Sequence, residues 1–67
     1  MDDTNTSPAY FALTSRLTPR GRRWRWNLVA GNGEVVASSE AYNSREAAAG
    51  GIAVVRRLAP GAAVRTL

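Results

Sequence analysis

The chain has 67 residues, nine basic and five acidic side chains, and a formal net charge of +4. This length allows one domain, and its core alone would be marginal because so short a chain buries only about 60% of its unfolded surface. The chain has no Cys and no His, which excludes disulfides and the strongest zinc or iron ligands, so we expect no metal or cofactor. A partner chain remains as a source of stability, and the composition therefore predicts a homodimer.

The first residues are acidic and polar where a signal peptide would be basic and then apolar, so we expect no targeting segment. The longest apolar runs are only a few residues, far short of the roughly 20 needed to span a bilayer. The lack of Cys agrees with a reducing compartment. We therefore expect a soluble, cytoplasmic protein with no membrane partner.

The N-terminal part of the chain divides into three segments. Residues 1–8 lack periodicity and predict a disordered tail, followed by a single domain over residues 9–67. Residues 10–15 alternate between two faces and contain aromatic side chains, which predicts a strand. Residues 16–23 contain a proline and a glycine among arginines, which predicts a loop.

The second predicted strand covers about residues 24–30 and places Trp24, Trp26 and Leu28 on one face, with polar side chains on the other. The Asn32-Gly33 pair that follows is the strongest short-range signal for a hairpin, because both turn residues must tolerate a positive φ.

The register of this hairpin stays open at the level of sequence. A two-residue loop would pair Leu28 with Ala37. A three-residue loop with a bulge at Gly33 would instead place Val36 opposite Leu28, and both arrangements keep the tryptophan face apolar.

A helix is predicted over residues 44–58, because Asn43 is a suitable N-cap and Glu46 completes a capping box. One face of this helix is apolar, and its members are Ala48, Ile52, Val55 and Ala59. Gly51 lies beside that face, and we expect its missing side chain to let the helix approach the tryptophan rings. Replacing it with leucine should then destabilise the fold.

The pair Pro60-Gly61 ends the predicted helix. Residues 62–67 alternate in character, which predicts a final strand. The element order is β-β-β-α-β, and the expected fold class is α+β, with an antiparallel three-stranded meander covered by one helix.

Four short motifs together resemble one known family. They are the aromatic-Arg-aromatic-x-Leu of Trp24, Arg25, Trp26 and Leu28, then Asn32-Gly33-Glu34, then Ser39, Glu40 and Tyr42, and finally Gly51-Ile52. The set is similar to the YegP-like family of small bacterial and archaeal proteins of unknown function, over about two-thirds of the chain. The arginine-rich first loop and Asn27 depart from the family pattern.

The resemblance implies a β3-α-β unit that works in pairs. Two such units share one continuous sheet and exchange their C-terminal strands. Because this chain carries one unit, the resemblance implies a homodimer, in agreement with the argument from core size, with Val64, Thr66 and Leu67 at the interface.

Two features suggest binding sites. Trp24 and Trp26 could stack nucleic-acid bases, but their alternation with arginine favours a buried core instead. The arginine cluster is a candidate site for nucleic acid or another acidic partner, and its proposed members are Arg20, Arg22, Arg23 and Arg25. A solvated loop in an arginine-rich chain is the alternative that we favour.

The sequence contains no arrangement of catalytic groups, because it has no His or Cys and local spacing places no second carboxylate near Glu40. We therefore expect no enzymatic activity, no catalytic residue and no identifiable small-molecule substrate. The leading hypothesis is a small homodimeric interaction or accessory module, and the alternative is a weak, sequence-nonspecific nucleic-acid binder.

Overall fold

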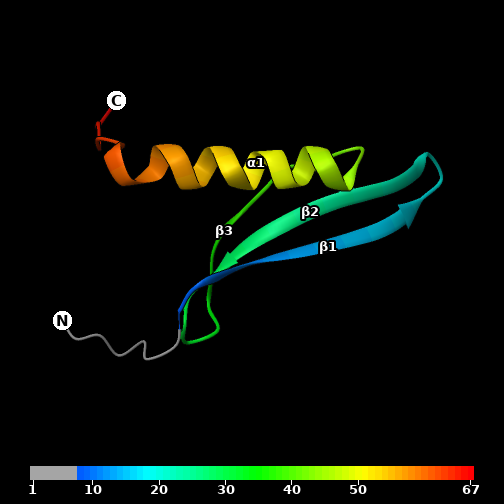
Figure 1. Cartoon of the computed structure of the whole chain (residues 1–67), viewed down its shortest axis with the longest axis horizontal. Coiled ribbons are helices and arrows are strands. Elements are labelled where there is room, and N and C mark those ends of the chain that lie inside the picture. Colours follow the sequence, from blue (N-terminus) through cyan, green and yellow to red (C-terminus); the bar gives the residue numbers. More distant parts are fainter. Residues whose placement is uncertain (1–7) are drawn as a thin grey trace.

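The computed structural model describes residues 8–67, so the predicted tail of residues 1–8 lies outside the described residues except for its last position. The elements are β1 (Tyr10–Thr18), β2 (Gly21–Val29), β3 (Val35–Ser38), helix α1 (Arg45–Leu58) and a 3-10 turn η1 (Ala59–Gly61). The three strands form one antiparallel sheet in the order β1-β2-β3, and α1 lies along one side of it (Figure 1). The α+β class and the β-β-β-α order are confirmed.

The loop predicted over residues 16–23 is wrong, because β1 and β2 stay paired almost to their ends. Thr18 pairs with Gly21, which leaves Pro19 and Arg20 as a two-residue turn. The Thr18 hydroxyl donates to the Gly21 carbonyl at 2.6 Å and accepts from the Arg20 N–H at 3.2 Å. Gly21 has a φ of +110°, which a residue without Cβ adopts at little cost. The proline and glycine therefore mark a tight turn, and the arginines around them lie in strands.

The turn between β2 and β3 is the three-residue arrangement. The Gly33 N–H donates to the Ala30 carbonyl at 2.8 Å, and the Ala30 N–H donates to the Glu34 carbonyl at 2.8 Å. Gly33 has a φ of +93°, as the left-handed position of such a loop requires. The Glu34 N–H also donates to the side-chain oxygen of Asn32 at 3.0 Å, which fixes the turn further.

A bulge then changes the register. Next to the turn Val29 pairs with Val35, whereas one residue further Leu28 pairs with Ala37. Val36 is the extra residue on β3. Each of the two registers left open by the sequence is therefore correct for one part of the hairpin.

Beyond β3 the chain continues along β2 as an irregular extension. The Ser39 N–H donates to the Trp26 carbonyl at 2.9 Å, and the Ser39 hydroxyl accepts from the Trp26 N–H at 2.9 Å. Trp24 and Tyr42 exchange two main-chain hydrogen bonds of 2.9 and 2.8 Å. These bonds fix the point at which the chain leaves the sheet for α1.

The N-cap of α1 is Ser44, and the prediction of Asn43 is wrong by one residue. Ser44 is extended, and its hydroxyl accepts from the Ala47 N–H at 3.0 Å. The bridge between Tyr42 and Trp24 holds the chain in the sheet until just before this point, so the helix begins at Arg45. The predicted end of the helix, Leu58, is confirmed.

Within residues 8–67 only Trp26, Val29 and Ala48 are buried hydrophobic residues. The Phe11 ring meets Trp26 edge to face, with ring centroids 5.3 Å apart. Of the four residues predicted for the apolar face of α1, Ala48 is buried, Ile52 and Val55 are half-buried, and Ala59 is exposed. The core on the helix side is therefore small, with Trp26 and Ala48 buried there, whereas Val29 lies on the other side of β2 by strand alternation.

The close approach at Gly51 is confirmed. A Cβ at this position would collide with the hydroxyl of Tyr42 and would lie 3.2 Å from Nε1 of Trp26. The prediction named the tryptophan rings as the neighbours, whereas the ring of Tyr42 is nearer still.

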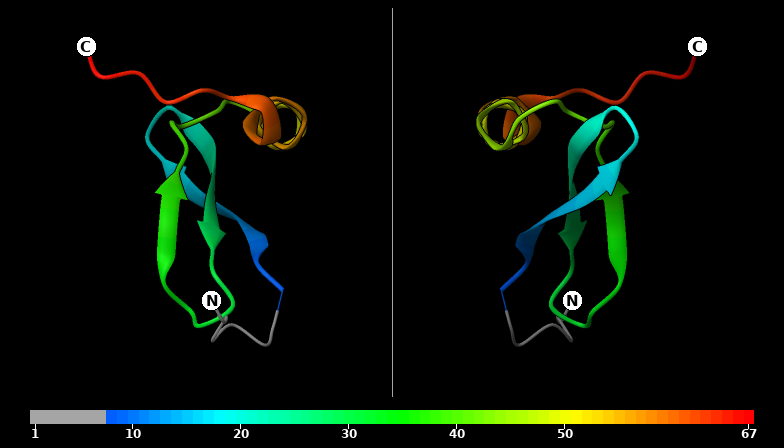
Figure 2. Two further views of the ribbon diagram at one scale, coloured as in Figure 1. Left: turned by 90° about the vertical axis from the view of Figure 1, so that its left-hand side faces the viewer. Right: turned by 90° about the vertical axis from the view of Figure 1, so that its right-hand side faces the viewer.

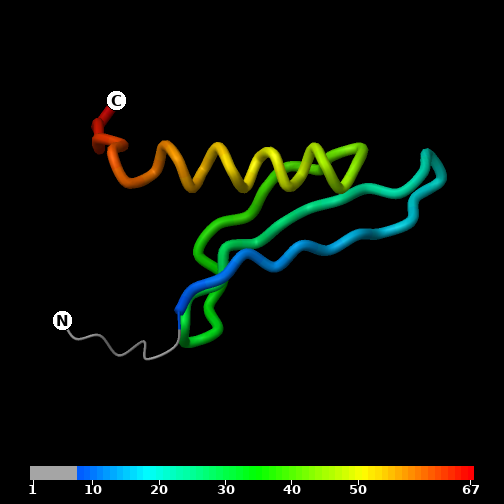
Figure 3. Tube along the Cα trace, in the orientation of Figure 1, coloured from blue at the N-terminus to red at the C-terminus, as the bar shows by residue number. Residues whose placement is uncertain are grey.

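Residues 62–67 form no regular secondary structure in the single chain. They run as an extended segment beyond the end of the helix (Figure 2), which lies at the upper left of Figure 3, and Val64 is 96% exposed. The radius of gyration is 14.1 Å, whereas a compact domain of this length has one of about 11 Å. The single chain is thus more extended than an ordinary domain of its size.

Candidate functional site

Pairing across the sheet assigns each arginine of the hairpin to a face. Residues that are directly opposite in an antiparallel pair point to the same side. Leu13 pairs with Trp26, which is covered by α1, so this pair marks the helix side. Arg25 pairs with Thr14, one position further along each strand, and therefore points to the other side.

Arg16 and Arg23 form the next pair with the same orientation as Arg25 and Thr14. Three arginines from two neighbouring strands thus lie on the side of the sheet that faces away from α1. We call this side the open face.

The four arginines predicted as a binding site do not form one patch. Arg23 and Arg25 lie on the open face, and Arg20 lies in the turn. Arg22 lies on the helix side, where its NH1 donates to the Ser15 hydroxyl at 2.8 Å. Arg16 belongs with Arg23 and Arg25 but is not in the predicted set, because a loop over residues 16–23 does not show which of its arginines lie opposite one another. The register across the Pro19-Arg20 turn, which places Arg16 directly opposite Arg23, is the feature that identifies it.

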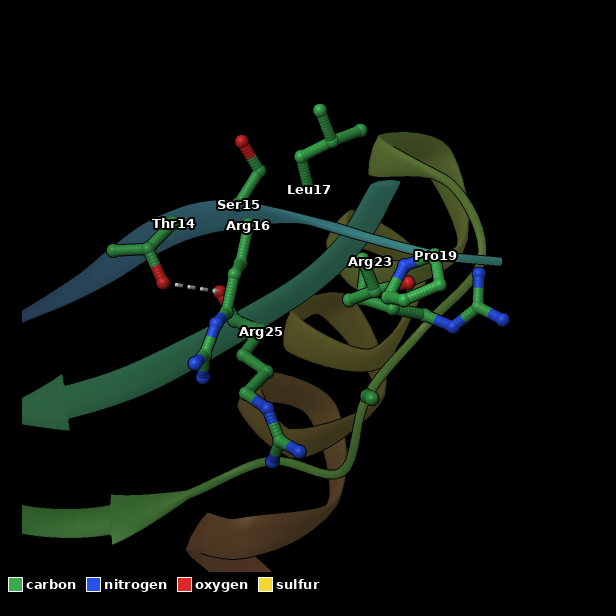
Figure 4. Close-up of a pocket in the computed structure, with 9 residues that line it drawn as sticks. Thr14, Ser15, Arg16, Leu17, Pro19, Arg23 and Arg25 are labelled. Carbon is green, nitrogen blue, oxygen red and sulfur yellow. Dashed lines mark hydrogen bonds between the residues drawn. The ribbon is translucent and has the colours of Figure 1, made fainter. Parts of the chain in front are cut away.

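The open face is hollowed beside these arginines. A cavity of about 580 Å³ lies there, and its lining includes Thr14, Arg16, Thr18, Arg23, Arg25 and Ala41 (Figure 4). Two neighbouring strands supply the arginines, and the segment that leads to the helix contributes Ala41. In Figure 4 the side chains of Arg16 and Arg25 extend on the same side of the hairpin, with the helix behind the sheet.

Among residues 8–67, the hydrogen bonds of Arg23 and Arg25 go to neutral main-chain acceptors. NH1 of Arg25 donates to the Ser39 carbonyl at 3.4 Å, and NH1 of Arg23 donates to the Arg22 carbonyl at 3.5 Å. Both acceptors are neutral and both distances are long for N–H···O bonds. Arg16 and Arg23 are directly opposite like charges, an arrangement that destabilises a sheet. The cavity is therefore a site of concentrated positive charge.

The two tryptophans do not contribute to this cavity. Trp26 is only 6% exposed and packs between the sheet and α1, while Trp24 is half-buried on the same helix side. The interpretation of Trp26 as core is confirmed, and the two rings lie on the side of the sheet opposite to the three open-face arginines. Nε1 of Trp26 is buried and has no hydrogen-bond partner among the described residues.

Within residues 8–67 no three His, Cys, Asp or Glu side chains gather where they could hold a metal ion. Over that range the structure also has no helix with the length and apolar character needed to cross a membrane.

The chain is similar to other small proteins in both sequence and structure. A protein named "UPF0339 protein" from Treponema denticola is 49% identical over 45 residues, which is 67% of this chain and 78% of the relative. The solution NMR structure of a protein from Haloferax volcanii superimposes with a TM-score of 0.74 at 33% identity and covers 92% of this chain and all of the other.

The sequence profile of a family described as "Domain of unknown function (DUF1508)" matches residues 21–65. That range contains all four motifs on which the resemblance to the YegP-like family was based. The matched range contains β2, β3, the bulged hairpin that joins them, and α1, whereas β1 lies before it. The chain belongs to this family of small proteins of unknown function, and its resemblance to the YegP-like proteins is thereby confirmed.

Proposed function

We propose that the chain is a non-enzymatic interaction module that works as a homodimer, in which each copy lends its C-terminal segment to the sheet of the other. The observation that carries the proposal is the state of residues 62–67. They are extended and exposed, and they alternate in character as a strand does, yet they lie outside their own sheet. Ordering such a segment costs conformational entropy, and only contacts with another surface would offset that cost.

The exposed edge of β1 is a suitable acceptor for this segment. It is regular over nine residues and contains no proline, whereas the other edge of the sheet, β3, has four residues and a bulge beside it. A long regular edge presents unpaired N–H and C=O groups that pair readily with a further strand. Leu17 on β1 is 71% exposed and would gain an apolar neighbour from such pairing.

The uncovered apolar surface supports the same proposal. Large apolar side chains are exposed at the C-terminal half of the helix and in the tail, and they are Val54, Leu58, Val64 and Leu67. With three buried hydrophobic residues in the described part of the chain, one copy has little core of its own. A second copy would cover these side chains, as the predicted interface residues Val64, Thr66 and Leu67 require.

A proline in the tail tests the exchange. In the proposed dimer the tail forms ladder hydrogen bonds, and a proline at position 64 removes one donor and blocks pairing. Val64→Pro should shift the protein toward monomer in sedimentation equilibrium, whereas Val64→Thr, which keeps the N–H and the branched side chain, should remain dimeric. Equal association of both variants would contradict the exchange of strands.

The alternative function, weak nucleic-acid binding, has less support. It requires Arg20, Arg22, Arg23 and Arg25 to act together, and they are divided between two sides of the sheet and a turn. Retention on DNA or RNA columns at several salt concentrations is the direct test. Steep loss of retention with added salt would support nucleic-acid binding, and no retention at low salt would end the hypothesis.

The lack of Cys leads us to place the module in the cytoplasm.

A further inference from the structure

The cavity on the open face has the charge of a binding site for an anion and is large enough to admit one. Its volume, about 580 Å³, is within the range of small-molecule pockets. Its lining combines Arg16, Arg23 and Arg25 with the hydroxyl-bearing Thr14 and Thr18. We propose that this cavity binds a small phosphate-bearing anion, held by the guanidinium groups of Arg16 and Arg25, with Arg23 adding positive charge beside them.

The positions of the arginines follow from the register of the β1-β2 hairpin. Arg16 is directly opposite Arg23, and Thr14 is directly opposite Arg25, so the four side chains occupy two consecutive rows on one side of two paired strands. Directly opposite Cβ atoms in such a sheet lie about 4.5–5.5 Å apart, so the three arginines start from neighbouring positions. In Figure 4 the side chains of Arg16 and Arg25 extend on the same side, whereas the guanidinium of Arg23 points away from them. Because regular strands carry all three arginines, the site is less mobile than a loop of the same composition.

Guanidinium groups are suited to phosphate because their planar set of N–H donors matches two phosphate oxygens at once. In the unliganded chain, the hydrogen bonds of Arg23 and Arg25 to main-chain carbonyls are 3.5 and 3.4 Å long, so shorter charge-assisted bonds to an anion would readily replace them. An anion would also relieve the repulsion between Arg16 and Arg23. The bound state is therefore favoured both by new bonds and by loss of an unfavourable charge pair.

A small anion fits this surface better than a nucleic-acid strand does. Nonspecific binding of single strands uses aromatic rings, on which bases stack, beside a charged groove. The residues that line the cavity include no aromatic side chain, and the two tryptophans are on the other side of the sheet. The site can hold a phosphate but offers no stacking surface beside it.

The site does not depend on the proposed exchange of tails, since its arginines and threonines come from one hairpin. The proposal can therefore fail while the dimer stands, and the reverse also holds.

The test is an NMR titration of the full chain with inorganic phosphate and with pyrophosphate, together with a thermal-shift assay. We expect saturable shifts of amide signals in the hairpin at Thr14, Arg16, Arg23 and Arg25, and a rise in Tm because the anion binds only the folded state. Arg16→Gln and Arg25→Gln should each weaken pyrophosphate binding about tenfold.

Two control variants lose the same charge elsewhere. Arg22→Gln is on the same strand but on the helix side, and Arg57→Gln is on the helix, so both should retain the affinity. Without anion, Arg16→Gln should melt at the same temperature as the original chain or higher, since it removes a like-charge pair.

Three results would overturn the proposal. The first is shifts that do not saturate or that appear at all arginines alike. The second is an equal loss of affinity in Arg22→Gln or Arg57→Gln. The third is binding of a single-stranded oligonucleotide that strengthens with strand length and exceeds pyrophosphate binding, which would assign the surface to nucleic acid.

Discussion

At the scale of single residues, Gly50 and Gly51 are adjacent in sequence but have different surroundings. A side chain at Gly51 would meet the Tyr42 ring and the Trp26 indole, whereas a side chain at Gly50 would meet nothing within 4 Å. Glycine weakens a helix by about 1 kcal/mol relative to alanine, so both positions have a cost in local stability. At Gly51 this loss of helix stability is offset, because the missing side chain lets the helix pack closely on the sheet. At Gly50 nothing offsets the loss.

Substitution of the two glycines by leucine should therefore have opposite effects. Gly51→Leu should lower the free energy of unfolding by roughly 1–3 kcal/mol, because the helix must move away from Tyr42 and Trp26. Gly50→Leu should raise it by up to about 1 kcal/mol through helix propensity. Thermal unfolding of both variants at one protein concentration measures the difference. A higher melting temperature for Gly51→Leu would show that the close approach is not required.

The N-cap gives a second prediction at this scale. The Ser44 hydroxyl accepts from the Ala47 N–H, so Ser44→Ala should cost about 1 kcal/mol of stability. Asn43→Ala should cost much less, because Asn43 lies outside the cap. Denaturant unfolding of the two variants decides between the positions, and a larger loss for Asn43→Ala would assign the cap to Asn43 after all.

At the scale of elements, the β2-β3 hairpin depends on one backbone conformation. Gly33 has a φ of +93°, and any residue with a Cβ is strained there. Gly33→Ala should destabilise the protein by roughly 1–2 kcal/mol, although its Cβ would meet no atom within 4 Å. Gly61→Ala is the matched control, since that position also has free space but no positive φ, and it should leave stability almost unchanged. Equal melting temperatures for the two variants would contradict a conformational role for Gly33.

Much of this element structure could be predicted from residue patterns, and the errors have local physical causes. Alternation and turn signals identified the strands and the second hairpin, and the helical period identified α1. The bulge at Val36 could not be predicted, because two registers kept the same face apolar and the difference lies in the geometry of the loop. The β1-β2 hairpin was not predicted, because arginines with a proline and a glycine are typical of a loop, although these residues pair regularly as strands.

The candidate site depended on the same pairing. Arg23 and Arg25 could be placed on one face from their spacing alone, but adding Arg16 required the register across the Pro19-Arg20 turn. The cavity between them also needs Ala41, whose position depends on the irregular extension of β3. A site built across a turn and a bulge is therefore less accessible to sequence reasoning than the strands themselves.

At the scale of the whole molecule, the single chain has a small core, an extended shape and an unused strand-like tail. A radius of gyration of 14.1 Å exceeds the roughly 11 Å of a compact domain of this length. The long edge of β1 is uncovered on its outer side. One change, pairing of the tail with a second copy, would cover the tail and that edge and enlarge the core. The proposal of a homodimer thus accounts for all three features together.

The molecular mass of the full chain in dilute solution tests this account most directly. Sedimentation equilibrium at micromolar concentration should give about twice the chain mass of 7.2 kDa. A chain truncated after Gly61 should give the mass of a monomer or unfold. A stable, folded species of 7.2 kDa for the full chain, with residues 62–67 paired to its own sheet, would contradict the account.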